Sequence, residues 1–121
     1  SIGYLNYGYV NGGQFQQASI QNKAGNFVKA NSETSAAGLS QIVLDDQLRG
    51  ADPNPAGANS YPIVSLTWIL AYPESPKNEA VKDTLRYTLS PEAQGISDSL
   101  GYVPLPEDLR QKSLAAVETL K

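Results

Sequence analysis

The sequence predicts a mixed α/β fold, and two observations support that prediction. Residues 63–72, IVSLTWILAY, are almost continuously apolar and rich in β-branched side chains, which indicates a strand covered on both faces, as in an α/β sheet. The segments that follow begin near Ser75, Ser90 and Pro106, and each combines a helix-start signal with apolar residues at helical spacing. A buried strand followed by capped helices therefore defines the expected fold class.

The chain opens with a second candidate strand, residues 2–10, IGYLNYGYV. Larger side chains alternate there with small or polar ones, and the stretch is rich in aromatic residues, which favours a strand. Tyr4, Tyr7 and Tyr9 are interpreted as half-buried strand aromatics, and a ligand-stacking face is the less favoured alternative.

Two further elements are expected before the chain reaches its long loop. The segment 18–28 predicts a hairpin with its turn around Gly25. A helix is expected over about residues 33–44, with Asn31 or Ser32 as its cap. A Pro- and Gly-rich loop then leads to the buried strand, and loops of this length are often functional or cross between lobes.

The last helices are defined by proline and glycine signals. Ser75 and Ser90 are predicted caps, each followed by a proline at the first helical position. Gly101 is the predicted stop of the middle helix, because glycine enters the left-handed conformation without a Cβ penalty. The sequence GYVPLP, residues 101–106, predicts a stiff and apolar extended linker between two helices, here called the staple. Pro106 then opens the final helix.

Composition excludes several classes of function. The 121 residues carry a net charge of −3 and no basic cluster, which argues against nucleic acid and against an anionic membrane surface. Histidine and cysteine are both absent, so thiol catalysis, Ser-His-Asp triads and nitrogen or sulfur zinc sites are excluded. No apolar run is long enough to span a membrane. The lack of methionine and the strand-like start predict a processed product or an excised fragment.

The charged residues offer no enzyme mechanism. Asp45 and Asp46 are the only candidate for a paired-carboxylate site, and neighbouring side chains at a helix end point in different directions. The arginines at positions 49, 86 and 110 are isolated, and each is by default a surface charge. We therefore predict a protein that is not an enzyme, with no catalytic residue, no metal ligand and no cofactor.

Ser65 and Thr67 are the only polar interruptions of the predicted buried strand. Hydroxyls in such strands usually bond to neighbouring main chain, and the alternative is that they lie beside a ligand or a hinge. They are kept as candidate ligand-binding residues in the sense of cleft neighbours.

One family resemblance covers essentially the whole chain. The residues that carry it are Ile2-Gly3-Tyr4, Tyr61-Pro62-Ile63 with Thr67, and residues 100–106, LGYVPLP. In this order they resemble the C-terminal part of the phosphate-binding proteins that serve high-affinity phosphate ABC transporters. The resemblance extends to about the last third of a family member.

The resemblance implies the C-terminal portion of a two-lobed periplasmic-binding-protein fold of type II. Residues 1–49 would then belong to the second lobe, residues 50–62 to an interlobe crossing, and residues 63–121 to the first lobe. The family's phosphate ligands, which are hydroxyls, helix-start N–H groups, an Asp and an Arg, lie in upstream loops. No position of this sequence matches those motifs, so Ser65 and Thr67 remain cleft neighbours only.

The leading functional hypothesis is a fragment of a substrate-binding component that captures inorganic phosphate and delivers it to a transmembrane permease. The resemblance places it in the periplasm or outside the cytoplasmic membrane, with a lipid anchor upstream as one option. Sulfate or molybdate stays open as the ligand. The alternatives are an interaction or regulatory module that acts through a protein partner, and a small hydrolase, which is the least favoured.

Overall fold

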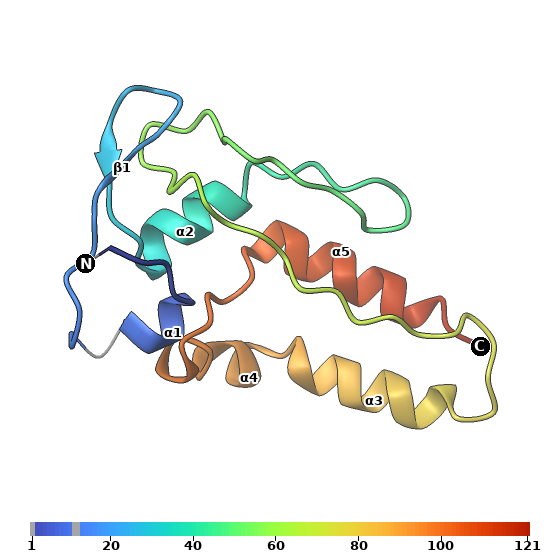
Figure 1. Cartoon of the computed structure of the whole chain (residues 1–121). Helices are drawn as coiled ribbons and strands as arrows, with labels where there is room; N and C mark the ends of the chain where they lie inside the picture. The colour runs from blue at the N-terminus through green and yellow to red at the C-terminus, as the bar shows by residue number, and fades with distance from the viewer. Residues whose placement is uncertain (1, 11–12) are drawn as a thin grey trace.

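The computed structural model of the chain describes residues 2–10 and 13–121, and it contains few strands and several short helices (Figure 1). The elements are α1 (Tyr7–Val10), β1 (Ile20–Gln21), β2 (Phe27–Val28), α2 (Ser32–Leu39), α3 (Asn78–Thr88), α4 (Pro91–Gly95), the 3₁₀ turn η1 (Asp98–Leu100) and α5 (Glu107–Glu118). No helix within the described ranges has both the length and the apolar character needed to cross a bilayer.

The predicted hairpin is confirmed. β1 and β2 pair antiparallel, with Ile20 opposite Val28, and Gly25 adopts a positive φ of 86° in the turn. The Asn22 side chain is buried, and its amide donates to the carbonyl oxygens of Ala58 and Ser60 at 2.8 and 3.2 Å. These bonds fix the hairpin to the loop that follows α2.

The predicted helix at 33–44 forms but ends earlier, at Leu39. Asn31 caps it through a capping box, in which the Thr34 N–H donates to Asn31 Oδ1 at 2.8 Å and the Asn31 N–H donates to Thr34 Oγ1 at 3.2 Å. At the other end, the Ile42 N–H donates to the carbonyl of Leu39, which tightens the chain into a turn. That turn buries Ile42 and leaves Val43 84% exposed, so Val43 lies outside the helix that was expected to extend to about residue 44.

The strand predicted at residues 2–10 is wrong. Residues 2–6 have no regular structure, and α1 follows them. The Asn6 side chain accepts from the Gly8 N–H at 3.0 Å, which starts a helical turn where the aromatic pattern suggested a strand. Tyr4 is fully exposed and Tyr9 is 74% exposed, so these two are not half-buried strand aromatics in this chain.

The strand predicted at residues 63–72 is also not formed. Within the part of the chain that the structure describes, none of its main-chain N–H groups donates to another main-chain carbonyl. A strand exists only as one member of a hydrogen-bonded ladder, and no other described segment forms such a ladder with these residues. The expected burial fails for the same reason, because Ile69 and Leu70 are 68% and 94% exposed.

Of the two serines predicted as helix caps, one is confirmed and the other is wrong. Ser90 caps α4 as predicted, since its Oγ accepts from the Ala93 N–H at 3.1 Å and Pro91 is the first helical residue. Ser75 is not the cap of α3. A turn closed by the Asn78 N–H and the Ser75 carbonyl precedes that helix, so α3 begins later than predicted.

The core is small and joins α2 to α5. Leu39, Ile42 and Leu109 are its buried members, and Leu109 is only 1% exposed. Partly buried residues that pack against them come from the loop after α2, the extended segment and the staple: Leu44, Val64, Leu66 and Val103. The staple thus packs as the sequence predicted, with Val103 against the core at the start of α5.

Gly101 ends η1 in the left-handed conformation, with φ of 80°, which confirms the predicted stop. It also lies directly against Gly8 of α1, so that a Cβ at position 101 would overlap the Gly8 Cα. The same glycine therefore serves a helix end and a contact between the two ends of the chain.

We expect Gly101→Ala to destabilise the chain. The left-handed backbone alone costs a non-glycine residue about 1–2 kcal/mol, and the overlap with Gly8 adds to that loss. The measurement is chemical denaturation followed by circular dichroism. Gly95→Ala is the matched control, because a Cβ at position 95 meets nothing within 4 Å. Equal losses for the two variants would contradict this reading of Gly101.

A second prediction concerns the core. Leu109→Ala should lower the free energy of unfolding by about 2–5 kcal/mol, because it leaves a cavity where a fully buried side chain packs. Leu70→Ala removes the same atoms from a side chain that is 94% exposed, and it should change stability by less than about 0.5 kcal/mol. The core assignment fails if both variants lose the same stability under denaturant.

Candidate functional site

The structure does not bring the two predicted cleft residues into one site. Ser65 and Thr67 are both exposed on the extended segment, and they face different hollows. Ser65 borders a small hollow of about 190 Å³ beside Ile42, whereas Thr67 borders a larger one of about 670 Å³. Ser65 Oγ makes only a marginal contact with the Leu66 carbonyl, at 3.5 Å. Their role beside a ligand stays a prediction.

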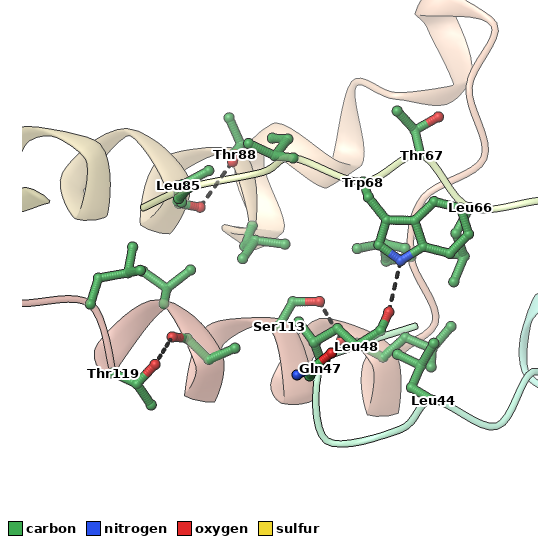
Figure 2. Close-up of a pocket in the computed structure, with 18 of the residues that line it drawn as sticks. Leu44, Gln47, Leu48, Leu66, Thr67, Trp68, Leu85, Thr88, Ser113 and Thr119 are labelled. Carbon is green, nitrogen blue, oxygen red and sulfur yellow. Dashed lines mark hydrogen bonds between the residues drawn. The ribbon is translucent and has the colours of Figure 1, made fainter. Parts of the chain in front are cut away.

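The larger hollow, here called the apolar groove, lies between α3, α5, the loop at 44–48 and the extended segment (Figure 2). Trp68 closes one end of it, because its indole N–H donates to the Leu48 carbonyl at 2.7 Å. The aliphatic side chains that line it come from all four walls: Leu44, Leu66, Leu85, Leu89, Leu109 and Val117. Such a surface attracts apolar material.

Four polar side chains of the apolar groove, all on or beside its helices, are engaged in hydrogen bonds. The hydroxyls of Thr88, Ser113 and Thr119 donate to main-chain carbonyls of their own helical turns, at 2.7–2.9 Å. The Gln94 side chain donates to the Thr88 carbonyl and accepts from the Leu105 N–H, both at 2.8 Å. Hydroxyls and amides that are bound in this way do not converge on a ligand.

Each of the three arginines is held by a carboxylate. Arg49 pairs with Asp45 at 2.8 Å, and Arg110 pairs with Glu107 at 2.7 Å. Arg86 makes two bonds to Glu118, at 2.6 and 2.8 Å, and these raise the pKa of the guanidinium above its ordinary value. Two parallel N–H···O bonds to one carboxylate are a geometrically specific arrangement. An anion would have to displace a partner at each arginine.

The adjacent carboxylates do not form an acid/base pair. Asp45 accepts from the main-chain and side-chain N–H groups of Arg49 and from the Gln47 N–H, all at 2.9 Å. The bonds from the Arg49 main chain and side chain lower the pKa of Asp45. Asp45 thus closes a turn that lies beyond the end of α2. Within the described residues, no group of three acidic side chains is placed to hold a metal ion.

Sequence reasoning did not anticipate the apolar groove. The signal that could have indicated it is the absence of charge between Asp52 and Glu74, a run that includes the whole extended segment. A charge-free run of that length is typical of a buried segment. In this structure, part of the run borders the apolar groove.

Comparison with known proteins gives a consistent set of relatives. The chain is 32% identical over 132 residues to the phosphate-binding protein PstS of Pasteurella multocida, which covers 98% of this chain and 36% of that protein. It is 30% identical to the phosphate-binding protein PstS of Methanocaldococcus jannaschii, over 100% of this chain and 35% of the relative. A PstS of Haemophilus influenzae is 32% identical over 72% of this chain. No family model matches the sequence.

The chain therefore spans about a third of the length of the curated relatives that it matches. This extent confirms the resemblance that the sequence motifs indicated, and it is consistent with a match to the C-terminal part of such proteins.

The ion pair between α3 and α5 predicts a pH dependence of stability. Arg86 lowers the pKa of Glu118 below its ordinary value of 4.5. A carboxyl whose pKa is lowered by folding stabilises the folded state fully above its unfolded pKa, and that contribution is lost as the pH falls through the folded pKa. The Glu118→Gln variant should therefore melt below the unmodified chain at pH 7, and the difference should shrink once the pH falls below about 4.5.

Thermal melts at a series of pH values measure this difference. Glu74→Gln is the control, because Glu74 makes no ion pair with any described residue and lies outside the helices. A gap between Glu118→Gln and the unmodified chain that persists unchanged at pH 3 would contradict the assignment.

Proposed function

The chain is homologous, over nearly its whole length, to about a third of the phosphate-binding proteins PstS, and from this relationship we propose that it is part of the substrate-binding component of a phosphate transporter. It acts without catalysis, by contributing to a protein that captures inorganic phosphate. The observation that carries the proposal is the match of 98% of the chain to a protein of that name.

In the proposed arrangement the complete protein has two lobes that close around phosphate, as in type II periplasmic binding proteins. Residues 1–49 contribute to the second lobe, residues 50–62 form a crossing, and residues 63–121 contribute to the first lobe. In this structure the crossing is held against the preceding portion, because the Tyr61 N–H donates to the Thr34 carbonyl at 2.9 Å and Ser60 Oγ donates to the Ala37 carbonyl at 3.1 Å.

The proposal assigns the residues that hold phosphate to the part of the complete protein that lies outside this chain. Phosphate sites use convergent N–H and hydroxyl donors, often with an arginine. In this chain Arg49, Arg86 and Arg110 are each bound to a carboxylate, and no arginine lines the apolar groove, whose walls carry many aliphatic side chains. Both observations support a binding site outside the chain, with Ser65 and Thr67 as neighbours of the cleft.

Delivery to a transmembrane permease and a location outside the cytoplasmic membrane complete the proposal. Closure of two lobes around an anion presents a new combined surface, which a permease can recognise. A lipid anchor upstream would keep the protein at the membrane. The alternative, a regulatory module acting through a protein partner, gains no support from relatives that are named for phosphate binding.

Isothermal titration with inorganic phosphate tests the proposed function. The chain of 121 residues should give no binding heat, whereas a longer form of the length of the relatives, as the proposal requires, should bind one phosphate. A parallel titration with sulfate reports whether the longer form selects phosphate among oxyanions. Tight binding by the short chain would show that a site exists within it, and absence of binding in both forms would overturn phosphate as the ligand.

A further inference from the structure

Leu48 has an unusual backbone conformation. Its φ is 58°, and among the described residues it is the one residue other than glycine with a positive φ. A residue with a Cβ adopts this left-handed region at an energetic cost, and it stays there only where its surroundings impose the conformation. Neighbouring groups must therefore hold Leu48 in place.

The turn at residues 45–49, here called the Leu48 turn, is closed by its own hydrogen bonds. The Leu48 N–H donates to the Asp45 carbonyl at 3.0 Å, and the Asp45 N–H donates to the Arg49 carbonyl at 2.9 Å. The Asp45 carboxylate also accepts from the main-chain N–H groups of Gln47 and Arg49, both at 2.9 Å. None of these bonds uses the Leu48 carbonyl.

The Leu48 carbonyl is held from outside the turn. It accepts from the Trp68 indole N–H at 2.7 Å, and Figure 2 shows this bond running from the indole ring to the Leu48 turn. In the proposed arrangement Leu48 lies in the second-lobe portion and Trp68 lies in the first-lobe portion. A side chain of one portion therefore stabilises a strained main-chain group of the other.

The Leu48 turn also lies at the position of a hinge. It ends at Arg49, and the crossing between the lobes is assigned to residues 50–62. Hinges are usually a few loop residues that absorb a change of φ and ψ. Once the bond from Trp68 is lost, Leu48 can move from the left-handed region to a more favourable one. Two discrete arrangements are thus available at this residue.

We propose that the Leu48 turn is a hinge that switches with lobe closure, and that the bond from Trp68 holds it in the closed form. The bond forms when the two portions come together, and Leu48 is then left-handed. When the portions part, the bond breaks and Leu48 relaxes. This inference rests on the proposed function, because closure around phosphate is the motion that the switch controls.

Tryptophan fluorescence tests the bond on the 121-residue chain, because Trp68 is its single tryptophan. Leu48→Val should shift the emission to longer wavelength, since a β-branched residue opposes a positive φ and the turn then releases the indole. Leu48→Gly should leave the emission unchanged, because glycine adopts a positive φ freely. Gln47→Val is the matched control, since it introduces the same side chain beside Leu48 at a residue whose φ is not positive. An equal shift for Leu48→Val and Gln47→Val, or no shift for either, would overturn the proposal.

Calorimetric titration with inorganic phosphate tests the switch in a form of the length of the relatives. Trp68→Phe removes the indole donor and should weaken phosphate binding about twofold to tenfold, which is the usual net worth of one hydrogen bond. In a Leu48→Gly background the same substitution should weaken binding less, because glycine keeps the turn without the bond. The packing lost with the smaller ring is common to both backgrounds. Equal losses of affinity in the two backgrounds would overturn the proposal.

The outcomes separate this inference from the proposed function. Phosphate should move the Trp68 emission of the longer form to shorter wavelength, because closure takes the indole out of water. Phosphate binding with unchanged emission, and with full affinity in Trp68→Phe, would overturn the switch and leave the function standing. Absence of phosphate binding would overturn the function. An emission difference between Leu48→Val and Gln47→Val in the short chain would then still support the bond as the group that holds the Leu48 turn.

Discussion

Main-chain hydrogen bonding governs what this chain can form. A helix satisfies its N–H and C=O groups within one segment, whereas a strand depends on a neighbour. α3 and α5 form accordingly, and so does the short hairpin of β1 and β2, whose two strands are adjacent in sequence. Residues 63–72 have the composition of an inner strand and no neighbour, so they remain extended and unpaired.

The small core follows from the same constraint. Leu39, Ile42 and Leu109 are buried where α2 meets α5, and the near end of the extended segment adds Val64 and Leu66. Beyond that point no layer covers the segment, and the apolar groove stays open between it and the two long helices. A sheet would normally bury these surfaces from both sides. The helices therefore pack as though they were one half of a larger α/β unit.

Local signals in the sequence predicted the local structure well. The Ser90 cap, the stop at Gly101 and the turn at Gly25 depend on atoms a few residues apart, and all three are present. The apolar, β-branched composition of residues 63–72 predicted a strand, but a strand requires a paired neighbour, and the described residues pair only β1 with β2. At residues 2–10 a local bond from Gly8 to the Asn6 side chain outweighed the aromatic pattern. Ser65 and Thr67 could be singled out as polar positions, but only the three-dimensional arrangement shows that they border different hollows.

Residues 63–72 bear on both the fold and the proposed function. Under the proposed function, a chain that matches a third of a phosphate-binding protein and has its arginines bound to carboxylates contributes framework rather than ligands to the phosphate site. Cross-strand nuclear Overhauser effects from residues 63–72, measured in an isotope-labelled longer form, test this account most directly. We expect contacts from both edges of the segment to residues outside this chain. Contacts only among residues of this chain, or none at all, would contradict the account.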